Sequence, residues 1–102
     1  MQKEHILTYL TDIKDELTKK GIEKIGLFGS FAKDSAGQLS DIDIAIKLKK
    51  SYLDEHDVWE YFRLIDTIKN RLFSRFSKKV DIYDLDSSSD IKNCIEKEII
   101  YV

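Results

Sequence analysis

Apolar residues recur at helical spacing in two long stretches of the chain. In the first, about residues 3 to 20, intervals of three and four residues place one apolar stripe along a helix. This stripe is formed by Ile6, Leu10, Ile13 and Leu17. Gly21 supplies the stop. The second helix is expected from about Asp54 to Phe76, with Asp54 and Asp57 resembling a pair of N-terminal caps. Its predicted buried face consists of Val58, Tyr61 or Phe62, Ile65, Ile68, Leu72 and Phe76.

The pattern between these helices changes to the alternation of a β-strand. Residues 41–48, "DIDIAIKL", alternate strictly. One face carries Ile42, Ile44, Ile46 and Leu48, and the other carries Asp41, Asp43, Ala45 and Lys47. Residues 22–28, "IEKIGLF", and 78–85, "KKVDIYDL", predict two more strands, and the terminal "EIIYV" predicts a short last one. Ahead of that last strand, Ser87 and Asp90 resemble a cap for a helix through Ile91, Cys94 and Ile95.

These elements predict one mixed α/β domain over residues 1–102, in the order α, β, short α, β, α, β, α, β. We expect a small mixed sheet flanked by helices, with the first two strands antiparallel. A right-handed crossover to the third strand would place the long helix over the Ile42, Ile44 and Ile46 face. The opposite face, which carries the aspartates, would then remain open.

Composition narrows the classes of function. The 17 Lys and Arg against 19 Asp and Glu give a formal net charge of −2, which argues against direct nucleic-acid binding. Charges recur every few residues along the N-terminal stretch, so neither a signal peptide nor a membrane span is expected. The single cysteine, Cys94, has no partner for an intramolecular disulfide, which is typical of a reducing compartment. We therefore expect a cytoplasmic protein.

Three carboxylates are candidates for chemistry. Asp41 and Asp43 share one face of their strand because strand side chains alternate with a period of two. Asp81 lies near the start of the third predicted strand, on its polar side. Should the two strands be neighbours, the three carboxylates would repel one another and raise each other's pKa values. Two Mg²⁺ ions roughly 3.5–4 Å apart would relieve this repulsion, bind nucleotide phosphates and activate an attacking hydroxyl.

The segment "GSFAK", residues 29–33, follows the first predicted strand directly. Gly29 permits a tight turn and a close approach to a ligand, and Ser30 begins a short helical turn. Free backbone N–H groups there, with the Ser30 hydroxyl, would form an anion site for the phosphates of a nucleoside triphosphate. Lys33 would add positive charge to it.

Gly29 and Ser30, ten further residues, Asp41 and Asp43, and a later strand-borne Asp81 together resemble the signature of the DNA polymerase β-like nucleotidyltransferase superfamily. Within it, "LFGSFAK", "SDIDIAI" and "VDIYDL" are similar to the minimal nucleotidyltransferase (MNT) antitoxins that accompany HEPN ribonuclease toxins. The resemblance covers nearly the whole chain. It implies the polymerase β-like nucleotidyltransferase fold, Mg²⁺ as cofactor and ATP as substrate.

By this resemblance, Asp41 and Asp43 would bind both metal ions, and Asp81 would help to bind the catalytic ion and take the proton from the acceptor hydroxyl. Gly29 and Ser30 would hold the triphosphate. The commoner family pattern has Arg and Gly where this chain has Lys33 and Asp34, so the planar two-pronged donor is absent and a negative charge lies beside the turn.

The resemblance also implies a function. The chain would transfer AMP from ATP to a hydroxyl, most readily a tyrosine, of a cognate HEPN toxin, with which it would assemble as a hetero-oligomer. One alternative is an antitoxin that neutralises its toxin by binding alone. Another is nucleotidyl transfer to a small molecule such as an aminoglycoside, although enzymes of that kind usually add a substrate-binding domain. Tyr52, Trp59 and Tyr61 are expected to be core or half-buried residues, and a partner-docking patch is the alternative for them.

Overall fold

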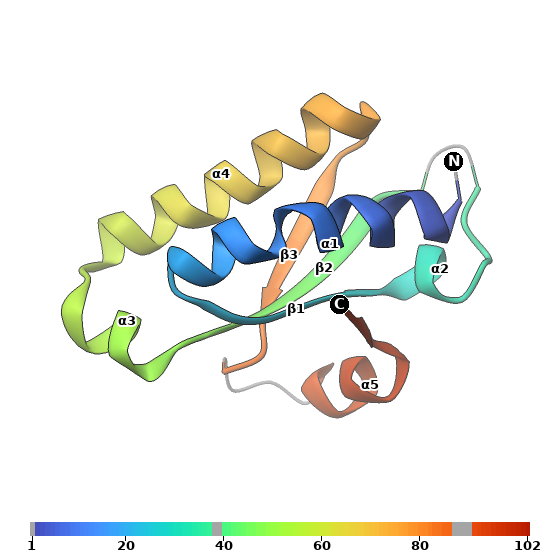
Figure 1. Ribbon diagram of the computed structural model, residues 1–102. Coiled ribbons are helices and arrows are strands. Elements are labelled where there is room, and N and C mark those ends of the chain that lie inside the picture. The colour runs from blue at the N-terminus through green and yellow to red at the C-terminus, as the bar shows by residue number, and fades with distance from the viewer. Residues whose placement is uncertain (1, 38–39, 87–90) are drawn as a thin grey trace.

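The computed structural model describes residues 2–37, 40–86 and 91–102, except the side chains at 91, 92 and 94 (Figure 1). Its helices are α1 (Lys3–Lys19), α2 (Gly29–Ala32), α3 (Lys50–Glu55), α4 (Val58–Phe76) and α5 (Ile91–Glu98). Its strands are β1 (Ile22–Phe28), β2 (Ile42–Leu48), β3 (Val80–Asp84) and β4 (Ile100–Tyr101).

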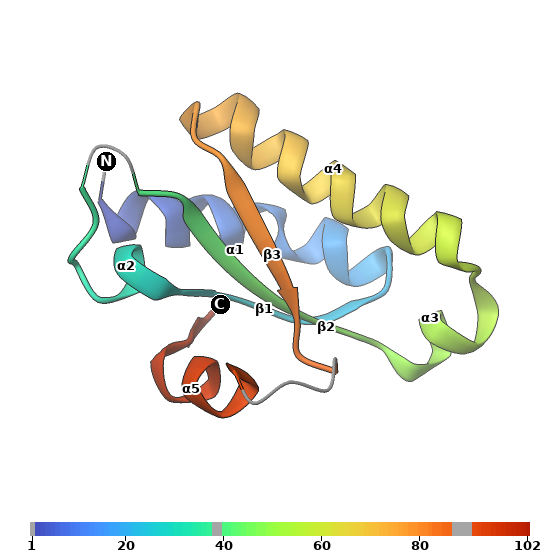
Figure 2. The same cartoon turned by 180° about the vertical axis from the view of Figure 1, so that it is seen from behind.

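The four strands form one sheet in the order β3-β2-β1-β4. β1 is antiparallel to β2 and to β4, and β2 is parallel to β3 (Figure 2). The predicted antiparallel pairing of the first two strands is therefore confirmed, and so is the mixed α/β class. The parallel pair requires a long crossover, which α3 and α4 provide.

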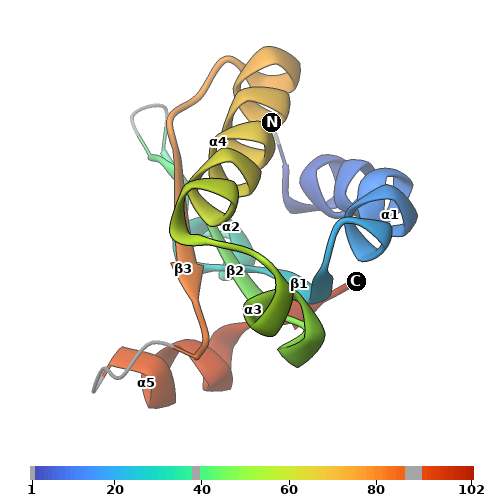
Figure 3. The same ribbon diagram turned by 90° about the vertical axis from the view of Figure 1, so that its left-hand side faces the viewer.

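The main core lies on one face of the sheet, beneath α1 and α4 (Figure 3). The strictly alternating pattern of β2 puts its isoleucines into this core, where the buried stripe of α1 also packs. The helix α4 contributes Leu64, Ile68 and Leu72, so the crossover helix covers the apolar face of β2 as predicted. The other face of the sheet carries α5 (Figure 1).

The end of α1 depends on a glycine. Gly21 has a φ of +116°, in the region that favours glycine, and a Cβ there would lie 2.3 Å from the ring of Tyr52. Its carbonyl oxygen accepts a hydrogen bond from the Lys49 N–H at 2.8 Å. Glycine at this position therefore follows the end of α1, as predicted, and also leaves space for the buried ring of Tyr52 in α3.

The predicted helix from Asp54 to Phe76 is wrong at its start. Asp54 lies inside the separate helix α3, and the chain is extended at His56 and Asp57. Asp57 is the N-cap of α4, and its Oδ1 accepts a hydrogen bond from the Glu60 N–H at 2.9 Å. A side chain that satisfies a free N–H of the first turn fixes where a helix begins.

The predicted buried face of this helix is also partly wrong. Val58 and Phe62 are exposed, and Ile65 and Phe76 are only partly buried. Leu64, absent from the prediction, is buried with Ile68 and Leu72 because these positions, four residues apart, lie on the side of α4 that faces the main core. The expected cap at Ser87 and Asp90 lies outside the described residues. No helix within the described ranges is long and apolar enough to cross a membrane.

Candidate active site

Two of the predicted carboxylates are neighbours across the parallel strand pair. Asp43 of β2 is in register with Asp81 of β3, and residues in register on adjacent strands share a face. Asp41 directly precedes β2. Burial raises the pKa of Asp43, and the negative charges of Asp81 and Asp41 raise it further. The sheet thus brings the three predicted aspartates close enough for their charges to interact.

The turn after β1 lies directly against one of these carboxylates. Phe28, the last residue of β1, is in register with Asp43. Gly29 then adopts a φ of +75°, and a Cβ at this position would lie 2.2 Å from Oδ2 of Asp43. Any side chain at residue 29 would therefore displace the Asp43 carboxylate. This close approach places the Gly-Ser turn and the aspartates in a single site.

The helical turn α2 begins at Gly29 and is anchored by its buried residues Phe31 and Ala32. The N–H groups at the start of a helix have no partner within the helix, so they are available to an anion. Ser30, partly buried, is the second residue of this turn. Its carbonyl oxygen accepts a hydrogen bond from the Ser35 N–H at 2.9 Å, which secures the chain that leaves the turn.

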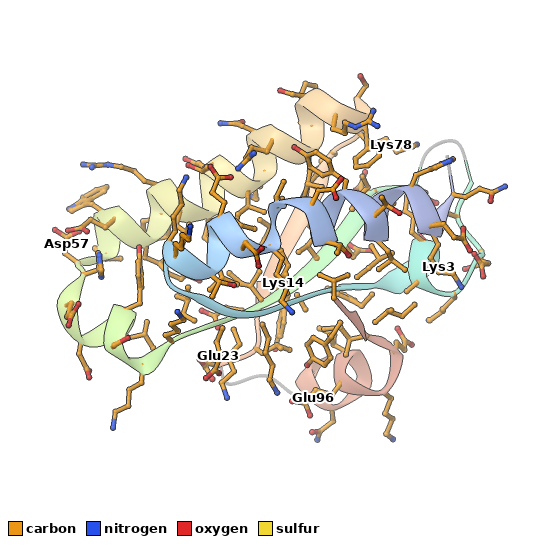
Figure 4. The ribbon with its side chains drawn as sticks, in the orientation of Figure 1. Lys3, Lys14, Glu23, Asp57, Lys78 and Glu96 are labelled. Atoms are coloured by element: carbon orange, nitrogen blue, oxygen red, sulfur yellow. The ribbon has the colours of Figure 1, made fainter. Side chains whose placement is uncertain are left out.

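Lys33 and Asp34 are each engaged by another element. The Lys33 ammonium lies 2.8 Å from a carboxylate oxygen of Glu98 in α5, with about half of its side chain exposed. Oδ2 of Asp34 lies 2.8 Å from Nζ of Lys3 in α1, which is labelled in Figure 4. The negative charge of Asp34 beside the turn therefore has a positive partner. A contact between Lys33 and a bound phosphate stays a prediction, and it would compete with the Glu98 pair.

The donor set suits Mg²⁺ better than a metal that needs a closed protein cage. Among the described residues, no group of three or more His, Cys, Asp or Glu side chains is placed so that it could hold a metal ion, and the three aspartates do not form one. Mg²⁺ is commonly held by one or two carboxylates, with substrate phosphates and water as its other ligands. Asp43 and Asp81 offer such a pair, and the pKa of Asp43 is raised first by burial and then by the negative charges of Asp81 and Asp41.

The aspartate face is less open than expected. Further along this face, Ala45, Leu85 and Ile95 form a second buried cluster, so α5 covers part of it. Tyr83 packs edge-on against Phe28 with ring centroids 6.5 Å apart. Its hydroxyl is buried without a hydrogen-bond partner in the described part of the chain. In the sequence, the apolar residues Leu85, Ile95 and Ile99 could have predicted that α5 packs over part of the aspartate face.

Comparison with known proteins identifies the family of the chain. The family described as "Polymerase beta, Nucleotidyltransferase" matches residues 11–102. An inferred protein adenylyltransferase of Methanocaldococcus jannaschii is 32% identical over 92 residues, covering 87% of this chain and 86% of the relative. The protein adenylyltransferase MntA of Thermococcus cleftensis is 29% identical over 102 residues, covering 97% and 94%.

Solved structures share the fold. An inferred minimal nucleotidyltransferase superposes with a TM-score of 0.72 at 20% identity, and the match covers 98% of this chain and 95% of that one. A toxin–antitoxin crystallised with AMP-PNP superposes with a TM-score of 0.62 at 24% identity, covering 99% and 72%. The family match spans most of the chain and includes the turn, the paired aspartates and the third strand. The chain therefore belongs to the polymerase beta nucleotidyltransferase family.

Proposed function

We propose that this protein is an Mg²⁺-dependent protein adenylyltransferase that transfers AMP from ATP to a tyrosine hydroxyl of a cognate HEPN ribonuclease toxin, and thereby acts as its antitoxin. The observation that carries the proposal is the register of Asp43 with Asp81 beside the close approach of Gly29. Relatives that bear the name protein adenylyltransferase support the reaction. A similar fold crystallised as a toxin–antitoxin with AMP-PNP is consistent with the partner and the donor.

In the proposed reaction, the acceptor hydroxyl oxygen forms a bond to the α-phosphorus of ATP. The bond from that phosphorus to the bridging oxygen breaks, pyrophosphate leaves, and the hydroxyl proton goes to Asp81. Asp41 and Asp43 would hold the metal ions with Asp81, and the backbone N–H groups at Gly29 and Ser30 would hold phosphate oxygens. Bound Mg²⁺ would neutralise phosphate charge and lower the pKa of the hydroxyl.

Access to the site favours a protein acceptor. Half of the Asp81 side chain is exposed to solvent. Nζ of Lys79 lies 4.0 Å from Oδ1 of Asp81. A tyrosine on the surface of a partner could therefore approach Asp81 from solvent. The partner would bring the remaining recognition surface.

The test is intact-mass spectrometry of the candidate toxin after incubation with this protein, ATP and Mg²⁺. We expect one or more added AMP masses with the native protein and at least a hundredfold slower transfer with Asp43→Asn, since removing a charge from the metal-binding group removes electrostatic stabilisation of the transition state. Asp12→Asn, on the exposed face of α1, is the matched control and should transfer at the native rate.

An unmodified toxin that still forms a stable complex would contradict the enzymatic proposal and favour neutralisation by binding alone. One observation gives this second function some weight. Lys33, the cation nearest in sequence to the turn, is paired with Glu98.

A further inference from the structure

Four large apolar side chains are exposed where α3 meets α4. The exposed fractions are 49% for Leu53, 55% for Val58, 69% for Trp59 and 52% for Phe62. The expectation that Trp59 is core or half-buried is therefore wrong. Val58, Trp59 and Phe62 lie within about one turn of α4, so they share one side of its first turns. We call these four residues the α3–α4 patch.

The patch borders a hollow. A cavity of about 310 Å³ is lined by Leu53 and Val58, together with Tyr52, His56, Asp57, Tyr61 and Asp84. Its inner wall is held in place because the Tyr61 hydroxyl donates a hydrogen bond to Asp84 Oδ2 at 3.0 Å. Burial and this hydrogen bond raise the pKa of Tyr61 to about 12. An apolar patch beside a preformed hollow is typical of a site that receives a partner's side chain.

The rim of the patch is acidic. Residues 53–60 contain Asp54, Glu55, Asp57 and Glu60 and no Lys or Arg. Asp54 and Glu55 are exposed, and neither forms an ion pair within the part of the chain that the structure describes. Glu60 lies 3.5 Å from the His56 ring, which is neutral unless protonated. Lys50 before Leu53 and Arg63 after Phe62 are the cations that flank this segment in the sequence. The surface therefore combines an apolar centre with a rim in which acidic side chains outnumber these two cations.

We propose that the α3–α4 patch is a docking surface for a partner protein that presents an apolar anchor surrounded by Lys and Arg. Charge complementarity selects this occupant, because a second copy of the chain docked through the same patch would set acidic rim against acidic rim. The inference rests on the proposed function in taking the toxin as that partner. An RNase needs a basic surface to bind RNA, and an acidic patch could cover it.

Docking at this patch would be spatially separate from the transfer chemistry. The helices α2 and α3 lie at opposite ends of the molecule (Figures 1 and 2). The labelled side chains show the same separation, since Asp57 lies at the end opposite Lys3, which pairs with Asp34 after α2 (Figure 4). Substitutions in the patch should therefore change partner affinity without changing nucleotide binding.

The experiment is titration calorimetry of the full chain against the cognate toxin at low and high salt. We expect the double variant Trp59→Ala, Phe62→Ala to weaken binding at least tenfold. Phe73→Ala removes a side chain of α4 that is equally exposed, at 57%, and should change affinity less than twofold. The charge reversal Asp54→Lys, Glu55→Lys should weaken binding and flatten its salt dependence. ATP binding by the isolated variants should equal that of the native chain.

Native affinity in the Trp59 and Phe62 variant would overturn this inference and leave the proposed function intact. A native chain that forms a dimer in sedimentation, while this variant stays monomeric, would show that a second copy occupies the patch and would also overturn it. A native chain with no affinity for the toxin would contradict both proposals at once.

Discussion

At Gly29 the candidate site leaves no space for a side chain. The positive φ of Gly29 and the 2.2 Å separation between a Cβ and Asp43 Oδ2 are two independent reasons for glycine at this position. The Asp43 carboxylate and the turn that would hold phosphates thus come into close contact at Gly29. The sequence predicted a tight turn and a close approach to a ligand at Gly29. Only the register of β1 with β2 shows that Gly29 lies against the Asp43 carboxylate.

We expect Gly29→Ala to lower the free energy of unfolding by about 1–3 kcal/mol, because alanine resists this backbone conformation. Transfer activity should fall further than stability explains, since the methyl group displaces Asp43. Urea unfolding and the rate of AMP transfer measure the two effects. Gly37→Ala is the matched control, because a Cβ at Gly37 meets no atom of the described residues within 4 Å. A Gly29 variant with the native transfer rate would show that the carboxylate position does not matter.

Asp43 should lower stability at neutral pH in the absence of metal. Its folded pKa is raised above the ordinary value of an aspartate, so the folded state binds the proton more tightly than the unfolded state. Stability therefore falls as pH rises from the unfolded pKa through the raised folded pKa. Asp43→Asn should stabilise the metal-free protein at pH 7, by less than about 1 kcal/mol because solvent screens the partly exposed group.

Thermal unfolding at pH 7 and near pH 4 measures this difference, which should shrink at the lower pH. Mg²⁺ should raise the melting temperature of the native chain more than that of the Asn variant, since binding to the folded state alone stabilises it. An Asn variant less stable than the native chain at pH 7 would show that Asp43 makes a favourable contact in the fold.

At the scale of elements, the strands were easier to predict than the crossover helices. Large apolar residues of β2 alternate strictly with polar residues or alanine, and a strand with this pattern can bury its large apolar residues on only one of its two faces. α4 has apolar residues on more than one side, so several stripes satisfy the helical period. Packing against the main core selects Leu64, Ile68 and Leu72, and the apolar residues left exposed on the first turns of α4 become part of the α3–α4 patch.

The start of α4 offers a direct test of capping. Asp57→Ala removes the acceptor of the Glu60 N–H and should cost about 0.5–2 kcal/mol of stability. Asp54→Ala, at the residue that the sequence suggested as the first cap, should change stability by no more than about 0.5 kcal/mol because Asp54 is exposed within α3. Chemical denaturation of both variants distinguishes them. Equal costs would show that the hydrogen bond from the Glu60 N–H to Asp57 adds no specific stability.

At the scale of the whole molecule, the sheet order decides which distant residues meet. Asp81 lies beside Asp43, 38 positions earlier in the sequence, because β3 pairs in parallel with β2 after the crossover. Glu98 reaches Lys33 because α5 returns across the aspartate face to pair β4 with β1. The chain extends 39 Å along its longest axis, which leaves room for separate surfaces at its two ends.

Periodicity and spacing were enough to predict the mixed α/β class, the strands, the first helix and the shared face of Asp41 and Asp43, because both are local properties of the chain. The break at Asp57, the buried side of α4, the partner of Lys33 and the partial cover of the aspartate face came only from the folded arrangement. Each of these depends on packing between elements far apart in sequence. A pattern within one element cannot specify which of its faces a distant element will cover.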